Sequence, residues 1–517
     1  MTRIIKKTLA QLFVILELAK CCFAANILIL GMPFYSHLVG IANVGKYLQS
    51  QGHDVRITIP PQLENKLQNY GVKPLLYHCL GELPDNRLLV SLIWNAYFEK
   101  PSLLRPMMST GVDSLVKGAA TKIVRDADLR QNIKKFKPDL ILLDSSAVAV
   151  ILTLIPYKLN IPFVIFGHAA LPQCTRAPIL PTVIPFKIST NPVHPDQMTF
   201  LERLFNTFMN LAYYRRSPFM NSSLIYEVVP EKPYISLTDL QAKAQLWIVH
   251  QSSILDNNPP LMPNEKRLPH LLNLTPKPLP KELQSFADNA DNGVVLVSFG
   301  SNLSSMPAQV KDKLLQAFVR TKYKFITQSF LQPNNQSDKF ISRKWLPQLD
   351  LLRHQKIKLF ITHCGANGLQ EALTAGVPII GFPVFGDQIQ NAGSMEKNGF
   401  GLKLNMKVFS VDELVSAIEE VVTNPSYKSK VEKVSAIFQS ERVPPIEEAA
   451  YWINHVLKFG GDHLRSYAQD IPLWKYLGLD IIAFCLFLWH VLVYLVVTLL
   501  RFCLSRCCGS KQKLKGE

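Results

Sequence analysis

The 517-residue chain is long enough for two to four domains, and its 48% hydrophobic content is enough for sizeable buried cores. Only 18% of its residues are charged, which argues against a disordered chain. The net charge of +17 raises the question of nucleic acid, but no basic run or zinc-ligand array accompanies it. We therefore expect no nucleic-acid partner, and a basic surface suits an anionic small ligand or an anionic membrane equally well.

Residues 1–25 resemble a secretory signal peptide. A basic start is followed by an apolar stretch over residues 9–23 and then by two alanines. Glu17 and Lys20 interrupt this stretch, which makes an uncleaved membrane anchor the less favoured alternative.

The carboxyl-terminal end predicts a membrane span. Residues 481–500 contain no Asp, Glu, Lys or Arg, and a helix of that length, at about 1.5 Å per residue, crosses the roughly 30 Å hydrocarbon core. A basic tail over residues 501–517 follows, and positive charge stays on the cytosolic side. Lys513 and Lys515 lie fifth and third from the end, which resembles the dilysine retrieval signal of endoplasmic-reticulum membrane proteins. We expect a single-pass type I protein of that membrane, with its large amino-terminal part in the lumen.

Cysteines are too few in the luminal part for a disulfide scaffold. Only Cys79, Cys174 and Cys364 fall there, and the sequence leaves a bridge between Cys79 and Cys174 open. The same part contains four Asn-X-Ser/Thr sequons, each weak by itself as a sign of glycosylation, at Asn221, Asn273, Asn302 and Asn335.

Short apolar runs alternate with helical patterns along the first half of the chain. Such an alternation is typical of βαβ units in a parallel sheet. The expected strands and helices cover residues 26–31, 39–51, 53–59, 139–144, 145–157 and 163–166. Prolines then crowd residues 156–195 before a helical pattern over 199–214, which we interpret as substrate-shaping structure or a variable surface region.

A second proline-rich stretch, residues 259–280, is typical of a linker, and the strand–helix alternation begins again after it. The sequence therefore predicts an α/β protein with two doubly wound, Rossmann-like domains facing a cleft, where ligands bind at the carboxyl ends of the strands. Neither first strand is followed by a G-x-G-x-x-G or P-loop motif, which disfavours dinucleotide oxidoreductases and P-loop NTPases. The expected elements of the second domain cover residues 294–298, 308–320, 324–327, 358–362 and 378–382.

The loop after the strand at 358–362 has the features of a pyrophosphate site. Gly365 and Gly368 allow close backbone approach, and the following helix offers free N–H groups and the positive end of its dipole. His363 and Asn367 are the side chains that we expect to donate hydrogen bonds to the phosphates.

Residues beside this loop suit a nucleoside. The indole of Trp345 can stack on uracil and the amide of Gln348 can read the edge of the base, although in isolation a core aromatic is the more common role for a tryptophan. We place Glu371 in the first turn of the helix, where it binds ribose hydroxyls or complements the helix dipole.

Two further positions lie at strand ends. Asp387 and Gln388 follow the next strand and offer a carboxylate and an amide to sugar hydroxyls, with a helix N-cap at Asp387 as the alternative. Ser301 follows the strand at 294–298 and is a candidate for capping the phosphates.

These positions form a combined pattern that resembles the signature of UDP-glycosyltransferases, most closely the animal UDP-glucuronosyltransferase branch. The pattern consists of W-L-P-Q at 345–348, F-I-T-H-C-G-x-N-G-x-x-E-A at 360–372 and F-G-D-Q-x-x-N at 385–391. The resemblance covers most of the chain, is weakest between about 60 and 260, and includes the approach to the membrane span at 447–453, 461–465 and 479–482.

The resemblance implies a GT-B fold and a single inverting displacement. UDP-glucuronic acid or UDP-glucose is then the donor substrate, a small lipophilic compound is the acceptor, and no metal or cofactor is expected. His37, in the first loop, would deprotonate the acceptor, and Asp144 would hold His37. Taken alone, His37 is an ordinary loop histidine and Asp144 a cap. Asp139 competes with Asp144 but begins the strand, at the wrong end of the sheet.

The same resemblance assigns the donor residues. Cys364 stands where the animal branch often has a small residue, and we assign it no redox role. The implied contacts are uracil for Trp345 and Gln348, ribose for Glu371, phosphates for Ser301, His363 and Asn367, and sugar for Asp387 and Gln388.

The resemblance also divides the chain into functional segments. We expect a signal peptide at 1–25, an acceptor-binding α/β domain at 26–258, a linker at 259–282, a UDP-sugar-binding α/β domain at 283–442, helices returning to the first domain and the membrane at 443–475, a transmembrane helix at 476–500 and a cytosolic tail at 501–517. Homo- or hetero-oligomers are compatible with this arrangement. The competing hypotheses are a non-catalytic UDP-sugar-binding membrane protein, which the presence of both His37 and Asp144 disfavours, and a UDP-sugar epimerase, which the donor pattern and the luminal topology disfavour.

Overall fold

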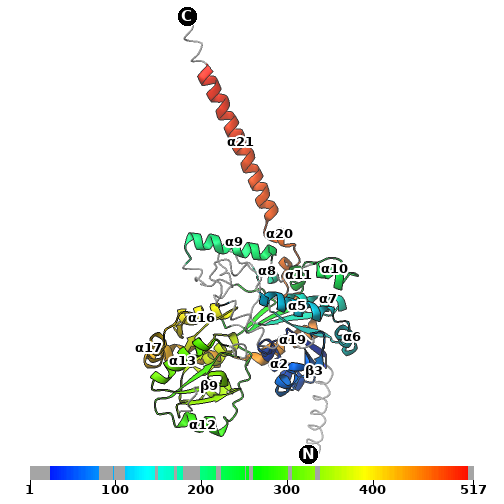
Figure 1. Cartoon of the computed structure of the whole chain (residues 1–517). Coiled ribbons are helices and arrows are strands. Elements are labelled where there is room, and N and C mark those ends of the chain that lie inside the picture. The colour runs from blue at the N-terminus through cyan, green and yellow to red at the C-terminus, as the bar shows by residue number, and fades with distance from the viewer. Residues whose placement is uncertain are drawn as a thin grey trace, which may run out of the picture. The chain divides into compact units, whose positions relative to one another are not determined.

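The computed structural model forms two units, Met1–Arg465 and Ser466–Glu517 (Figure 1). The expected signal peptide lies almost wholly outside the described residues, as do Ser301, the sequons at Asn221, Asn302 and Asn335, and the lysines of the tail. The structure describes residues 24–80, 97, 111–145, 149–167, 172–177, 198–216, 223–250, 252–255, 260–300, 306–331 and 338–509.

The first sheet of unit Met1–Arg465 has seven parallel strands in the order β3-β2-β1-β4-β5-β6-β7. Its strands are β1 Asn26–Leu30, β2 Asp54–Ile59, β3 Lys73–Leu76, β4 Leu140–Asp144, β5 Phe163–Gly167, β6 Leu246–His250 and β7 Glu265–Leu268. The accompanying helices are α2 Tyr35–Ser50, α3 Pro61–Leu67, α5 Gly111–Arg125, α6 Ala127–Phe136, α7 Leu154–Leu159, α8 Pro172–Thr175, α9 Phe200–Arg216, α10 Leu224–Val228 and α11 Leu237–Gln241.

Both faces of this sheet are buried, which explains why its central strands are continuous apolar runs. Along β1, Leu28 and Leu30 pack into the core beneath α5 and α6, whereas Ile27 and Ile29 pack into the core on the α2 face. Successive side chains of a strand point to opposite faces, so a strand covered on both sides needs an apolar residue at every position.

The second sheet repeats this plan with six parallel strands in the order β10-β9-β8-β11-β12-β13. Its strands are β8 Val294–Ser298, β9 Lys324–Gln328, β10 Phe340–Arg343, β11 Ile357–Thr362, β12 Ile379–Gly381 and β13 Gly401–Lys403. Helices α13 Ala308–Arg320 and α17 Val411–Thr423 cover one face, and the other face is covered by α12 Lys281–Asp288, α15 Ala366–Ala375, α16 Gln388–Lys397 and α18 Pro425–Gln439.

Strand order reverses at the centre of each sheet, between β1 and β4 in the first and between β8 and β11 in the second. Doubly wound sheets bind ligands beyond the carboxyl ends of the strands at such a switch point. The fold therefore predicts a ligand site at the loops after β1, β4, β8 and β11.

Three expectations about the elements need correction. Helix α2 begins at Tyr35, so His37 lies in the first helical turn and not in a loop. The expected linker at 259–282 contains β7, a polar edge strand that lacks the apolar run of the central strands. Glu371 is the sixth residue of α15, beyond the first turn, so the alternative in which it complements the helix dipole does not hold.

Helix α19, Pro445–Phe459, returns to the first sheet after the second sheet is complete. Ala449 and Ile453 belong to the same core as β1, and Nε2 of His53 donates a hydrogen bond to Oδ1 of Asn454 at 2.8 Å. Arg465 donates to the carbonyl oxygen of Ala242 at 3.0 Å. Residues 445–465 therefore fasten the end of this unit to its beginning.

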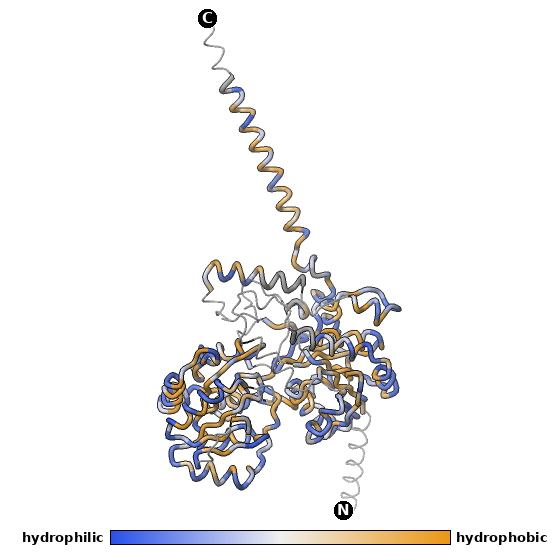
Figure 2. Tube along the Cα trace, in the orientation of Figure 1, coloured by the Kyte–Doolittle hydropathy of each residue, from blue (hydrophilic) through white to orange (hydrophobic). Residues whose placement is uncertain are grey.

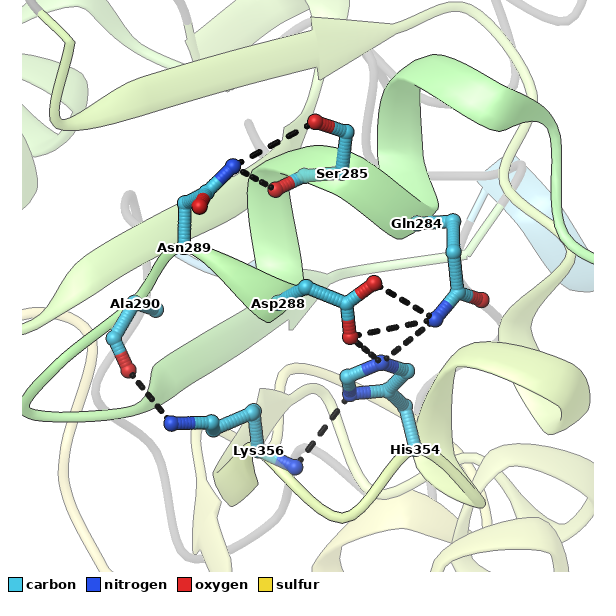
Figure 3. Close-up of polar contacts among 7 residues, drawn as sticks. All are labelled: Gln284, Ser285, Asp288, Asn289, Ala290, His354 and Lys356. Atoms are coloured by element: carbon cyan, nitrogen blue, oxygen red, sulfur yellow. Dashed lines mark hydrogen bonds and ion pairs between the residues drawn. The ribbon is translucent and has the colours of Figure 1, made fainter.

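A polar cluster joins α12 to the amino-terminal end of β11 (Figure 3). The backbone N–H of Lys356 donates to Nδ1 of His354 at 3.2 Å, which leaves the ring proton on Nε2, 3.1 Å from Oδ1 of Asp288. The amide nitrogen of Gln284 lies 3.1 Å from the other carboxylate oxygen of Asp288. Because the cluster precedes β11, it lies at the edge of the sheet opposite to the loop that follows the strand.

Unit Ser466–Glu517 is dominated by α21, Leu479–Gly509, which follows the short helix α20, Leu473–Tyr476. Within Leu479–Arg506, a window of 18 residues has a mean hydropathy of 2.5 and is exposed, so this helix is long and apolar enough to cross a membrane (Figure 2). The helix continues past the predicted end at residue 500 because no helix-breaking residue occurs before Gly509.

Candidate functional site

His37 and Asp144 meet at the switch point of the first sheet. Gly31 directly follows β1, and a Cβ there would approach Leu38 to 2.7 Å, so glycine lets α2 begin close to the sheet. Asp144 is the last residue of β4, and its Oδ2 lies 3.0 Å from Nδ1 of His37. The backbone N–H of Met32 donates to the same oxygen at 3.4 Å. Two neighbouring strands thus orient one imidazole–carboxylate pair.

The surroundings of His37 make it more basic. Burial lowers its pKa, but the charge of Asp144, the hydrogen bond to Asp144 and the charge of Asp387 raise it by more, so the pKa is raised above its ordinary value. The side chain of His37 remains 29% exposed, against 9% for Asp144. This is the arrangement of a base that a carboxylate orients and that an incoming hydroxyl can reach.

The loops after β8 and β11 close around His363. Gly300 has φ +70°, and a Cβ there would lie 2.9 Å from Cε1 of His363. A Cβ on Gly365 would lie 2.6 Å from Nε2 of the same ring. Burial lowers the pKa of His363 to about 4, against an opposing contribution from Asp387, so the ring is neutral at physiological pH and carries one N–H donor.

Cys364 adopts a left-handed conformation, φ +61°, in the tight turn between β11 and α15. Its side chain is fully buried over β12, where a Cβ on Gly381 would lie 2.4 Å from the sulfur. Burial raises the pKa of this thiol, which therefore stays protonated. Cys364 fills a small space, as expected, and the helix α15 begins immediately after Gly365 in its extended N-cap conformation.

The predicted nucleoside residues lie together beside α15. Trp345 is 65% exposed, which gives its ring a face on which a base can stack. Gln348 begins α14, Gln348–Leu352, and its amide donates to the carboxylate of Glu371. Burial raises the pKa of Glu371 to about 7, with the Gln348 hydrogen bond acting in the opposite direction. Gly368 leaves room for the Gln348 amide, which a Cβ would approach to 3.3 Å.

The predicted sugar residues differ in exposure. Asp387 is exposed at the N-cap of α16 and makes no side-chain cap, which removes the alternative of a capping role. Gln388 is buried, and its Oε1 accepts from the backbone N–H groups of Val384 and Phe385 at 3.0 and 3.2 Å. Any contact of Gln388 with a sugar hydroxyl therefore falls to Nε2.

Residues of the two sheets touch at this site. Nδ2 of Asn367, an expected phosphate ligand, donates to the carbonyl oxygen of Ser36 at 3.0 Å. The ring of Tyr35 meets that of Trp345 edge to face, with the centroids 5.6 Å apart. The first turns of α2 and α15 thus meet at the carboxyl ends of the two sheets, and Trp345 contacts α2 from the segment before α14.

Some residues that shape the site had no role assigned from the sequence. Asn391, the last residue of the F-G-D-Q-x-x-N pattern, donates to the carbonyl oxygen of Cys364 at 3.0 Å and to Asp387 at 2.8 Å. Gln328 holds the β8 loop through the N–H of Phe299 and the carbonyl of Gly300. No local pattern marks Gln328 or Tyr35.

The structure also describes the luminal cysteines, the metal-ligand side chains and one of the glycosylation sequons. Cys79 and Cys174 are both free thiols whose pKa values burial raises to about 12, so the bridge that the sequence left open is not formed. Within the described ranges, no three His, Cys, Asp or Glu side chains are grouped in a way that could hold a metal ion. Asn273, the one sequon among the described residues, is exposed.

Comparisons with known proteins identify the family and the fold. A family model described as "UDP-glucoronosyl and UDP-glucosyl transferase" matches residues 26–514. Similar relatives include UDP-glucuronosyltransferase 1A1 of Mus musculus, 28% identical over 93% of this chain and 91% of the relative, and UDP-glucuronosyltransferase 2B17 of Rattus norvegicus, 28% identical over 96% and 97%.

Among solved structures, the fold is similar to that of a UDP-glucosyltransferase from Polygonum tinctorium capable of glucosylating indoxyl. The TM-score is 0.58 at 15% identity, over 84% of this chain and 99% of that one. The spinosyn forosaminyltransferase SpnP gives the same TM-score and identity over 84% and 100%. These likenesses show the GT-B fold of two parallel Rossmann-type sheets.

Proposed function

The chain belongs to the family of UDP-glucuronosyl and UDP-glucosyl transferases, and we propose that it transfers glucuronic acid, or alternatively glucose, from a UDP-sugar to a hydroxyl group of a small lipophilic acceptor. The observation that carries this proposal is the His37–Asp144 pair, because the helical turn of His37 contacts the first turn of α15, beside the proposed phosphate site, through Asn367. Glycosyl transfer requires a base for the acceptor hydroxyl close to the site that binds the sugar donor.

In the proposed reaction, Nδ1–H of His37 donates to Asp144, and Nε2 takes the proton of the acceptor hydroxyl. The acceptor oxygen attacks the anomeric carbon from the face opposite to UDP as the bond from that carbon to the phosphate oxygen breaks. One displacement inverts the configuration. Asp144 stabilises the imidazolium that forms, which is consistent with the raised pKa of His37.

The leaving UDP gains negative charge, and the second sheet is suited to receive it. The amino end of α15 supplies unpaired N–H groups and the positive end of a helix dipole directly after the loop of His363 and Gly365. Neutral His363 adds a donor, and we assign the same role to Asn367 and Ser301. Trp345, Gln348 and Glu371 would bind the uridine, and Asp387 and Gln388 the sugar.

We further propose that α21 anchors the protein in the endoplasmic-reticulum membrane with the catalytic unit in the lumen. The exposed apolar surface of α21, the basic residues after it and the signal-like amino terminus support this topology. Acceptors that dissolve in the bilayer would then be concentrated near the enzyme.

The test is turnover by microsomes that contain the full chain, with a mixture of simple phenols and either UDP-glucuronic acid or UDP-glucose. We expect product from at least one donor, and His37→Ala to reduce the rate by about 100- to 10,000-fold, the usual contribution of a general base. UDP binding without product from either donor would favour the alternative of a non-catalytic UDP-sugar-binding membrane protein.

A further inference from the structure

The first turn of α2 meets the donor residues of the second sheet at three consecutive positions. Tyr35 contacts Trp345, the carbonyl oxygen of Ser36 accepts from Asn367, and the charge of Asp387 acts on His37. In the proposed function these partners bind uracil, phosphate and sugar in that order. The helical turn that carries the proposed base therefore contacts residues assigned to each part of the donor. Of its three residues, only His37 has a role in the proposed function.

Tyr35 fixes the plane of the Trp345 ring. The two rings lie at 84° with centroids 5.6 Å apart, the edge-to-face geometry that aromatic pairs prefer. Trp345 is otherwise 65% exposed, so few other contacts restrain it. A ring held at its edge keeps a face available for a base, whereas an exposed indole without this contact samples several rotamers.

Tyr35 is itself anchored in the first sheet. Its ring packs against the core on the α2 face, and its hydroxyl lies 3.1 Å from the hydroxyl of Tyr70, whose ring packs against the same core. Burial and the charge of Glu371 raise the pKa of Tyr35 against the opposing hydrogen bond to Tyr70, so the phenol stays neutral. Tyr35, which is packed against the first sheet, thus supports the exposed Trp345 of the second domain.

We propose that Tyr35 is a positioning residue of the donor site, which holds Trp345 for stacking on uracil and couples base recognition to the helical turn that carries His37. This inference rests on the proposed function, because it requires that Trp345 bind a uracil base. The inference adds to the donor site a residue of helix α2, which packs on the first sheet.

A double-mutant cycle on equilibrium binding of radiolabelled UDP to the detergent-solubilised full chain tests the inference. Tyr35→Ala should weaken UDP binding by about two- to twelve-fold, the range of an aromatic pair. Tyr35→Phe keeps the ring and should stay within about twofold of wild type. In a Trp345→Ala background, Tyr35→Ala should cause no further loss, because its effect passes through the missing indole.

The matched control is Tyr226→Ala, which deletes one ring of a stacked tyrosine pair with Tyr234 outside the site and should leave UDP affinity unchanged. If Tyr35→Ala fails to fold, Tyr35→Leu fills the core position without an aromatic ring. Equal losses from Tyr35→Ala in both backgrounds, or no loss in either, would overturn the inference and leave the proposed function intact. Absence of UDP binding by the wild-type chain would overturn both.

Discussion

Replacing Asp144 with asparagine separates charge from shape at the proposed base. The amide has nearly the size of the carboxylate and keeps an oxygen that can accept from His37 and from the N–H of Met32, as Oδ2 does now. The negative charge is lost. The fold should therefore survive while the basicity and orientation of His37 change.

The expected loss follows from the hydrogen bond that is altered. A hydrogen bond to a charged group contributes about 1.5–3 kcal/mol, which corresponds to about a 10- to 160-fold fall in kcat if the bond acts fully in the transition state. The pKa of His37 should also fall, because burial lowers it and the charge of Asp144, the larger of the two contributions by which Asp144 opposes burial, is removed.

The assay is the pH dependence of kcat/KM for wild type and variant with a saturating acceptor. In the wild type, activity should appear as His37 loses its proton, above its ordinary pKa of 6.5. In Asp144→Asn this acid limb should move to lower pH while the plateau falls. Asp139→Asn is the matched control, since it makes the same change at the other end of the strand, where Asp139 accepts from the N–H of Asn26 at 2.8 Å.

Stability should respond with a defined sign. A histidine whose pKa is raised in the folded state adds stability below its unfolded pKa, and that stability is lost as pH rises through the folded value. Asp144→Asn should therefore lower the unfolding temperature more in acid than at alkaline pH. An unshifted acid limb with an unchanged plateau, or a limb moved to higher pH, would refute the reasoning.

Three further predictions concern other parts of the molecule. If Glu371 binds the ribose as we propose, affinity for UDP-glucose should rise as pH passes through about 7, because the carboxylate that forms there accepts hydrogen bonds from hydroxyl groups. Titration calorimetry should find this dependence absent in Glu371→Gln. Gly300→Ala puts a Cβ at φ +70° and against His363. It should raise the donor KM by about 5- to 30-fold, the cost of a left-handed non-glycine residue. An unchanged KM would show that the loop adapts. His354→Ala removes the polar cluster on the opposite edge of the sheet. Thermal denaturation should show a loss of about 1–3 kcal/mol in stability, and the donor KM should be unchanged. A changed KM would contradict the separation of that cluster from the site.

The central architecture was predictable because both sheets are covered on both faces. Four of the five positions of β1 and four of the five positions of β8 are therefore apolar, and a continuous run such as residues 294–297 is visible in the sequence. Helix Ala308–Arg320 also matched its predicted bounds, since its apolar residues recur at helical spacing. Edge strand β7 has one neighbour and polar residues, so its sequence resembled a linker.

The candidate site was predictable in part. Glycines and a histidine after a strand indicate a phosphate loop from local chemistry alone, and Gly365 and His363 are adjacent in the structure as that chemistry requires. Contacts between distant segments leave no such signal. Tyr35 and Trp345 are 310 positions apart, and neither the edge-to-face contact nor the bond from Asn367 to Ser36 follows from any local spacing.

The configuration of the product tests the central claim most directly. NMR spectroscopy of the glycoside made from an α-linked UDP-sugar should show a β-linked product, formed by the wild-type chain and lost with His37→Ala. Such a result would mean that a base in the first sheet directs one inverting displacement on a donor held by the second. An α-linked product, or a β-linked product formed equally well without His37, would contradict the account.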